Sequence, residues 1–378
     1  MKKRLFILIG LILVITGCSN KKEIQYQAYA VGLGIDFKDD EFTVTLQFLD
    51  FANVAKTEQP NSTQPAPIWL GIGKGKTIEE AITQIYQGLQ IQANFDQLNI
   101  IIFSKDALKY KLDESLSALM TNFNIRMTGW VYGTEENIED IFTAKVPFYY
   151  PYTASNLNKP LESHQQSSTI PPFTLEKLVY DNNEPTRTVI LPNIIVKKKF
   201  IKKDQEPFVV TVIDGAWNIK DKKFKGLLHE KDIIGFVRMN NQAVRTLMTL
   251  NEGQNIPLSL EIDSPKVMRN AEIKNGQLEC QLKITFSVTL REGAVGRNIS
   301  KTKKSIEEKV KDEIMTAFEN AKKEDVDLYQ FEDYLYRYNF EEWKTFKKEK
   351  LPLSLSKNHI SINISPLESI GKLRSEIN

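Results

Sequence analysis

The sequence predicts a multi-domain α+β protein, with an N-terminal α/β region at residues 28–196 and a C-terminal α+β domain at 205–372. Strand-like and helix-like segments alternate in the first region, which indicates a mixed sheet covered by helices. In the second region most strand-like segments precede two amphipathic segments, which indicates an antiparallel sheet packed by two helices. The composition of 41% hydrophobic and 26% charged residues is typical of globular domains, and 378 residues suffice for two or three of them.

The N-terminal region opens with two strand-like segments, 28–36 and 42–48. Thr77 stands three residues before Glu80 in a capping-box pattern, and apolar residues at helical spacing follow, so a helix is predicted over 77–91. The remaining predicted elements are strands at 98–103, 127–132 and 188–192 and helices at 112–122 and 173–181.

Two segments interrupt this alternation. Residues 143–172 contain five prolines and three tyrosines, a composition that predicts a long exposed loop, and a subdivision of the region near 145–190 is left open. Residues 197–204 include five lysines and are interpreted as a weakly structured crossing between domains. A solvated hairpin flank is the favoured explanation of these lysines, because no aromatic interleaving suggests a nucleic-acid site.

The C-terminal domain combines alternating strands with helices. Asn275-Gly276 is the strongest short hairpin signal in the chain and joins two strongly alternating segments. Cys280 lies in the second of these and is expected to be a small buried residue. The predicted elements are a β-meander at 209–228, strands at 257–262, 266–273, 278–290 and 360–364, and helices at 302–323 and 327–338.

Residues 1–17 have the pattern of a bacterial secretion signal, in which three positive charges precede an apolar run at 5–15. That run is shorter than the roughly 20 apolar residues that span a bilayer. The residues that end at Gly17 resemble a bacterial lipobox, so we expect cleavage between Gly17 and Cys18 and lipidation of Cys18. Residues 18–27 would form a lipidated tether on the outer face of a membrane. An ordinary secretory signal with a chance cysteine is the alternative.

Charge and motif content exclude several classes of protein. Cleavage would remove three of the 50 Lys and Arg residues, leaving 47 against 48 Asp and Glu, and this balance suggests no nucleic-acid partner. The histidines, His164, His229 and His359, are isolated, so no metal site is predicted. The segment Gly71 to Thr77 contains Gly-Lys-Thr without the spacing of a phosphate loop. No catalytic residue and no cofactor site is predicted.

The order of several segments resembles the Ger(x)C family of spore germination lipoproteins, the C subunits of nutrient germinant receptors. The likeness covers nearly the whole mature chain, and the order of the segments carries it. These segments are the lipobox, Val31–Asp36, Gly75–Ala81, Gly215-Ala216-Trp217, Phe224–Leu228, Asp327–Phe331 and Trp343.

The resemblance implies a three-domain fold and attachment by lipid to the outer face of the inner spore membrane. It also implies a membrane-embedded A subunit and a transporter-like B subunit as partners, and no catalytic residues. The function expected is therefore that of a non-enzymatic subunit that couples or stabilises a germinant receptor.

Two alternatives remain open from the residues alone. A solute-binding lipoprotein of a membrane transporter would share the Cys18 tether but would need two similar lobes around a cleft. A cell-wall hydrolase is the other. Aromatic residues are the candidates for partner contacts, with buried packing expected for about half of them: Phe148, Tyr149, Tyr150, Tyr152, Tyr334, Tyr336 and Tyr338.

Overall fold

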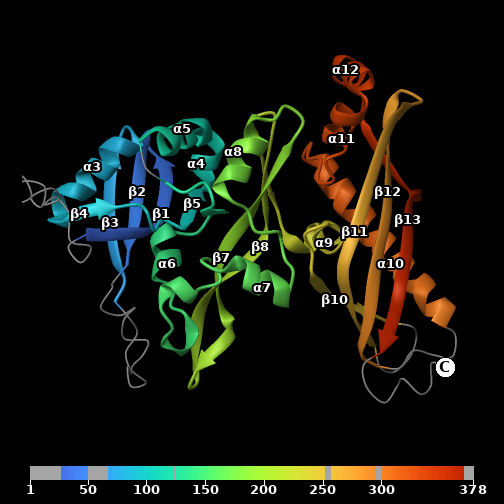
Figure 1. Ribbon diagram of the computed structural model, residues 1–378, viewed down its shortest axis with the longest axis horizontal. Coiled ribbons are helices and arrows are strands. Elements are labelled where there is room, and N and C mark those ends of the chain that lie inside the picture. Colours follow the sequence, from blue (N-terminus) through green and yellow to red (C-terminus); the bar gives the residue numbers. More distant parts are fainter. Residues whose placement is uncertain (1–26, 50–66, 123–124, 252–256, 294–298, 370–378) are drawn as a thin grey trace, which may run out of the picture.

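The computed structural model describes residues 27–49, 67–122, 125–251, 257–293 and 299–369. Within them the chain forms two sheets with helices packed on both, so the predicted multi-domain α+β class is confirmed (Figure 1). Gly17 and Cys18, the predicted cleavage and lipidation sites, lie outside the described residues, as does the end of the predicted C-terminal domain at 370–372.

The larger sheet is mixed and has nine strands among the described residues, in the order β3-β2-β1-β5-β6-β7-β8-β9, with β4 paired to β1. Strands β1, β5, β6 and β7 are parallel to their neighbours in this series, whereas β2, β3, β8 and β9 are antiparallel additions at the two sides. The strands are β1 (Gln27–Lys38), β2 (Glu41–Phe48), β3 (Trp69–Gly75), β4 (Gln92–Asn94), β5 (Ile100–Ser104), β6 (Trp130–Thr134), β7 (Thr188–Lys203), β8 (Glu206–Lys220) and β9 (Lys223–Leu228).

Helices cover both faces of the central strands. Alternate residues of β5 enter two separate apolar clusters, Ile101 and Phe103 in one and Ile100 and Ile102 in the other, which explains why this segment has no polar face. The helices of this region are α3 (Ile78–Leu89), α4 (Lys105–Tyr110), α5 (Leu112–Asn122), α6 (Ile138–Thr143), α7 (Pro160–Gln166) and α8 (Leu175–Asn183).

Helix α3 begins where the capping pattern predicted. The Thr77 hydroxyl accepts the backbone N–H of Glu80 at 3.1 Å, and the Glu80 carboxylate accepts the backbone N–H of Lys76 at 2.7 Å. The helix then packs directly on β3, because a Cβ atom built on Gly73 would lie 2.0 Å from the carbonyl oxygen of Ala81. Only glycine at this position permits such a close approach.

Residues 143–172 do not form the exposed loop that their composition suggested. They contain α7 and two short 3₁₀ helices, Pro147–Tyr149 and Tyr152–Ala154, and they bury Leu157 and Ile170. The segment packs beneath the sheet because side chains satisfy its backbone: the Tyr132 hydroxyl donates to the Leu157 carbonyl at 2.9 Å.

The lysine-rich segment 197–204 is the end of a long hairpin, because strand β7 continues to Lys203 and β8 begins at Glu206. The favoured explanation of its lysines as a hairpin flank is therefore confirmed, whereas the expectation of a weakly structured crossing is wrong. Strands β8 and β9 therefore continue the larger sheet instead of starting the second one. Apolar residues on both strands pair across the hairpin, including Ile194 with Ile213, and this long-range pairing outweighs the local charge.

The second sheet has four strands in the described chain, in the order β10-β11-β12-β13. The first three are antiparallel, and although the strand at 245–250 was not predicted, the antiparallel pairing of the next two was. Residues 257–262 and 266–273 form one strand with a bulge between Asp263 and Lys266. The last strand, β13, instead pairs with β12 in parallel. The elements are β10 (Arg245–Leu250), β11 (Leu258–Lys274), β12 (Gln277–Glu292), β13 (Leu353–Ser369), α9 (Ile234–Arg238), α10 (Ile299–Lys323), α11 (Phe331–Tyr338) and α12 (Phe340–Glu349).

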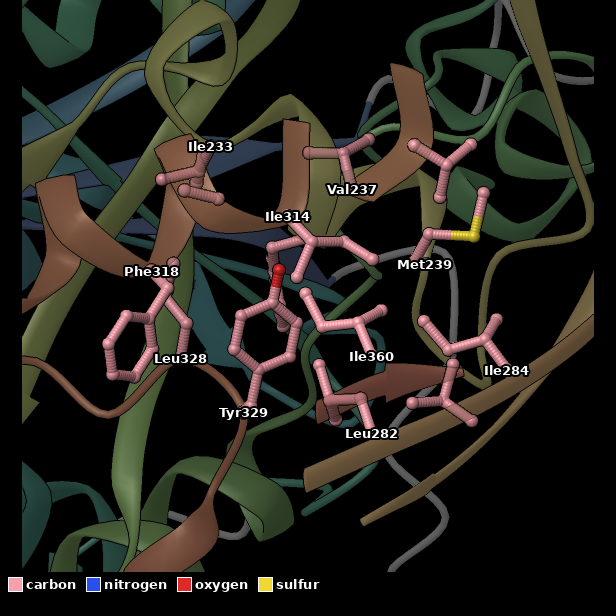
Figure 2. Packing of buried hydrophobic residues seen from close by; sticks show 14 of the residues in the cluster. Ile233, Val237, Met239, Leu282, Ile284, Ile314, Phe318, Leu328, Tyr329 and Ile360 are labelled. Carbon is pink, nitrogen blue, oxygen red and sulfur yellow. The ribbon is translucent and has the colours of Figure 1, made fainter. Parts of the chain in front are cut away.

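Helix α12 was not predicted and explains the direction of β13. It returns the chain to the start of β12, where Leu353 pairs with Leu278. Helix α10 covers the sheet as its apolar face predicted. Figure 2 shows Ile314 and Phe318 of α10 beside Leu328 and Tyr329, over Leu282 and Ile360 of β12 and β13. Cys280 is fully buried in the same cluster, as expected.

The two sheets are joined through the turn before α11 and the first turn of that helix. Arg187 pairs with Asp333 at 3.2 Å, and Lys220 of β8 pairs with Glu332 at 3.3 Å. The side-chain amide of Gln330 both donates to the Thr188 carbonyl and accepts its backbone N–H. These contacts are polar and ionic, with Glu332 almost fully buried among them, and Ile190, Ala216 and Leu228 add apolar packing against the second sheet.

Candidate interaction surfaces

Two groups of exposed aromatic side chains mark candidate interaction surfaces. The first, here called the hairpin surface, comprises Phe148, Tyr150, Phe200 and the lysines of residues 197–203. Phe148 is 86% exposed, and Tyr150 and Phe200 are each 61% exposed. Isolated apolar side chains on a surface are normal, but these lie on neighbouring segments among like charges.

The hairpin surface is assembled by packing between distant segments. A groove is lined by Thr143 and Lys145 on one side and by Val196, Lys198 and Phe208 on the other. Further along, the Asn156 amide donates to the Thr211 carbonyl at 2.9 Å, and the Thr211 hydroxyl donates back to the Asn156 side-chain oxygen at 2.9 Å. Figure 1 shows the segment after α6 and the end of the β7/β8 hairpin reaching the same end of the molecule.

The second group, the aromatic surface, lies on α11 and α12 at the other end of the molecule (Figure 1). Tyr336 lies 4.8 Å from Trp343 and 5.6 Å from Phe340, and Phe340 stacks on Trp343 at 5.4 Å between ring centroids. Tyr338 is 75% exposed and lies 4.6 Å from Tyr334. Edge and offset contacts between aromatic rings stabilise the packing of the two helices. Tyr338 and Phe340 remain exposed.

The structure separates the seven predicted aromatic residues into different roles. Phe148, Tyr150 and Tyr338 are exposed, whereas Tyr334 is half-buried and packs on the core. Tyr152 buries its hydroxyl without a hydrogen-bond partner in the described chain, so its role is packing. Tyr336 takes part in the ring cluster, and Tyr149 belongs to the first 3₁₀ helix.

The sequence analysis missed Phe200 as a surface residue, although a signal for it was present. Phe200 interrupts a run of lysines, and the Lys199 ammonium lies over its ring at 5.2 Å. Such a cation–π contact keeps an exposed ring in place among charges. The expectation that no aromatic residue interleaves these lysines was wrong, because Phe200 lies among them and could have been interpreted as a contact residue.

The residues considered for catalysis or ligation are engaged in structural contacts. Lys76 of the Gly-Lys-Thr segment lies near Asp40 and Glu41, each at 3.8 Å, at the turn between β1 and β2. His164 is hydrogen-bonded to the Gln242 carbonyl at 2.9 Å, and burial lowers its pKa. No group of three or more potential metal ligands occurs among the residues that the structure describes. None of the described helices is both long and apolar enough for a membrane span.

Comparisons with known proteins agree with this architecture. One family model, described as the spore germination protein N-terminal domain, matches residues 20–196, and a second, described as spore germination B3/GerAC like, C-terminal, matches residues 214–365. The crystal structure of the GerBC protein has the same fold, with a TM-score of 0.53 at 17% identity, over 89% of this chain and 97% of that chain.

Curated relatives come from Bacillus subtilis (strain 168). Spore germination protein KC is 22% identical over 371 residues, which cover 90% of this chain and 89% of that protein. Spore germination protein A3 is 25% identical over 145 residues, 38% of each chain. Fold and matched domains together define a spore germination protein. The chain belongs to the Ger(x)C family, the C subunits of germinant receptors, which supports a role in spore germination.

Proposed function

We propose that this protein is a lipid-anchored, non-enzymatic subunit of a nutrient germinant receptor, which couples or stabilises the receptor in the spore membrane. Its partners would be a membrane-embedded A subunit and a transporter-like B subunit, as the family resemblance implies. Membership of the Ger(x)C family and the lipobox that ends at Cys18 support this proposal.

The observation that carries the proposal is the position of the hairpin surface relative to the start of β1. Ile138 faces Gly34 and Phe142 faces Gly32, so α6 runs antiparallel to β1. The chain therefore leaves α6, toward Phe148, on the side where β1 begins at Gln27.

A tether from Cys18 would enter the fold on this same side. Nine residues precede Gln27 from Cys18, and an extended chain of that length spans at most about 30 Å. Lipidation would thus hold the hairpin surface close to the membrane and to integral partners, where a high effective concentration lets weak contacts suffice. Exposed aromatic side chains with a basic surround fit such a contact.

The test is recovery of the A and B subunits from spore membranes with the full chain as bait. Replacing Phe148 and Tyr150 by serine should strongly reduce recovery, because the replacement removes exposed apolar area without changing the core. Tyr338→Ser, on the aromatic surface, is the matched control and should recover both subunits. Cys18→Ala should release the chain from the membrane and impair germination while the fold stays intact.

Unchanged recovery of both subunits by the Phe148/Tyr150 variant would contradict the assignment of this surface. Normal germination of spores that carry Cys18→Ala would refute the tether as part of the function. The solute-binding alternative is not favoured, because a nine-stranded mixed sheet and a four-stranded sheet are not two similar lobes.

A further inference from the structure

A cavity of about 170 Å³ lies between the two sheets, away from both candidate interaction surfaces. A cavity of this volume has room for several waters or for a small ligand of a few non-hydrogen atoms. Its walls combine charged and amide groups with an apolar part, the arrangement typical of small-molecule sites at domain junctions. The apolar part consists of Pro171, Phe173, Ile190, Met239, Val267 and Leu328.

Arg269 is the unusual residue in this cavity. It lies on β11 between Val267 and Ala271, which are both buried, so it belongs to the face of the strand that packs inward. Its guanidinium donates one hydrogen bond, 2.7 Å long, to the Tyr329 carbonyl. No carboxylate among the described residues forms a salt bridge with Arg269, and a partly buried guanidinium with five N–H donors is then poorly compensated.

The opposite wall supplies two further cations. Lys177 and Arg187 both pair with the buried carboxylate of Asp181, at 2.5 and 3.0 Å, and Arg187 also pairs with Asp333. The cavity is therefore lined by three cations, Lys177, Arg187 and Arg269, and by the carboxylate of Asp181, while Asp333 lies outside its lining. Burial lowers the pKa of Arg269 and the charge of Arg187 also lowers it, whereas the charges of Asp327 and Asp333 raise it.

A third carboxylate, Asp327, lies close to Arg269 but is engaged elsewhere. Its oxygen accepts the backbone N–H of Glu332 at 2.8 Å, and the charge of Lys220 lies beside it. Asp327 is not among the residues that line the cavity. The described groups that line the cavity thus carry more positive than negative charge, and Asp327 and Asp333 offset it only in part, because they also face Lys220 and Arg337.

We propose that this cavity binds a small aliphatic carboxylate. Its two oxygens would pair with the planar fork of Arg269, the geometry that a guanidinium matches best, and Arg187 would lie close to the same negative charge. The hydrocarbon part would lie against Phe173, Ile190 and Met239. An anion suits walls that carry more cations than carboxylates, and the small volume suits a short hydrocarbon chain.

Binding at this cavity would act on the junction between the two sheets. Arg187 directly precedes β7 of the larger sheet, and Arg269 belongs to the second sheet. A carboxylate seated between them replaces the repulsion of two like charges with attraction to a common anion. The ligand therefore favours the docked arrangement of the two halves. The proposal is independent of the function proposed above.

Calorimetric titration of the full chain in detergent with sodium propionate tests this inference, with propionamide as the neutral analogue of the same shape. Propionate should bind saturably and raise the temperature of unfolding, and propionamide should do neither. Arg269→Met should weaken propionate binding by roughly ten- to a hundredfold, because a charge-assisted hydrogen bond is lost. Arg126→Met removes an exposed arginine outside the cavity and should leave binding unchanged.

Equal binding of propionate and propionamide would overturn the proposal. Equal propionate binding by the wild type and Arg269→Met would also overturn it, as would saturable binding of inorganic phosphate but not of propionate. Arg269→Lys keeps the positive charge but lacks the planar guanidinium, and it tests the contact with the carboxylate if Arg269→Met does not fold. It should bind propionate several-fold more weakly than the wild type, and wild-type affinity in this variant would count against the bidentate contact.

Discussion

The Tyr329 side chain buries its hydroxyl group in the apolar core of the second sheet. Figure 2 shows its ring among the apolar side chains under α10, and its hydroxyl has no hydrogen-bond partner within the described chain. Burial raises the pKa of this phenol far above its usual value. An unsatisfied buried hydroxyl destabilises the fold by the free energy of its lost hydration.

Tyr329→Phe should therefore raise the free energy of unfolding, by about 1 kcal/mol. Tyr132→Phe is the matched control, since its hydroxyl is equally buried but donates to the Leu157 carbonyl, and its removal should lower stability by about 1 kcal/mol. Urea unfolding of both variants measures the contrast. Equal losses in the two would show that the Tyr329 hydroxyl is satisfied.

Glu230 is a titrating group in the short link between the two sheets. Its pKa is raised to about 6, because burial and then the charge of Asp214 raise it more than the charge of Arg238 lowers it. Because the folded pKa exceeds the ordinary value of 4.5, the folded state holds this proton more tightly than the unfolded chain. The stabilisation is complete below pH 4.5 and is lost as the pH rises through 6.

Between pH 7 and pH 5 the wild type should consequently gain about 1 kcal/mol from Glu230. Glu230→Gln should lack this component of the pH dependence, whereas Glu176→Gln, at an exposed helix position, should retain it. Unfolding curves across this range provide the measurement. A glutamine variant that follows the wild-type pH profile would show that Glu230 titrates normally.

At the scale of elements, the close contact of β3 with α3 requires a glycine, which has no side chain, at position 73. A Cβ on Gly73 would meet the backbone carbonyl of Ala81, and backbone cannot move aside as a flexible side chain can. Gly73→Ala should destabilise the protein by at least about 2 kcal/mol. Gly88, within α3 itself, has nothing within 4 Å of its Cβ position.

Gly88→Ala is hence the natural control and should be neutral or stabilising by up to about 1 kcal/mol, through helix propensity alone. Thermal unfolding of the two variants separates steric fit from propensity. If Gly73→Ala proved as stable as Gly88→Ala, the close approach of strand and helix would be disproved.

The elements with strong local signals could be predicted from the sequence. Helices α3 and α10 and strand β5 follow directly from capping and apolar spacing. Helix α12 could not be predicted in this way, because Phe346 is its one buried side chain, Phe340 and Trp343 are only partly covered, and the other residues are polar. The packing of residues 143–172 rests on hydrogen bonds to distant segments, which no local pattern reveals.

The surfaces were predictable only in part, for the same reason. Composition identified Phe148 and Tyr150 as candidates, but it could not tell them from Tyr152, whose burial depends on Ile194 and other residues of the same cluster. The cavity with Arg187 and Arg269 could not be foreseen, since it brings together residues from two sheets. That Arg269 faces inward can be recognised only when the register of β11 is known.

At the scale of the whole molecule, Asp333 connects the two halves. Its carboxylate binds Arg187 at 3.2 Å and Arg337 at 2.9 Å, and it accepts the Thr186 hydroxyl at 3.2 Å. Removing one partner from a largely buried network leaves the other charges uncompensated.

Asp333→Ala should lower stability by about 3 kcal/mol and should separate the unfolding of the two halves into distinct steps. Glu341→Ala, which removes an exposed pair with Lys344, is the control and should change little. Unfolding followed by calorimetry distinguishes one transition from two. A single transition with wild-type stability in the aspartate variant would mean that apolar packing holds the halves together.

The parallel partnership of β12 with β13 also has a consequence for how the chain is made. Three helices separate the two strands, so one edge of β12 stays open while more than fifty residues are still to be added. An open edge of such length is a template for pairing with other chains. Strand β13 closes this edge late in synthesis, and ribosomes that stop before it would release chains prone to aggregate rather than chains that are only less stable.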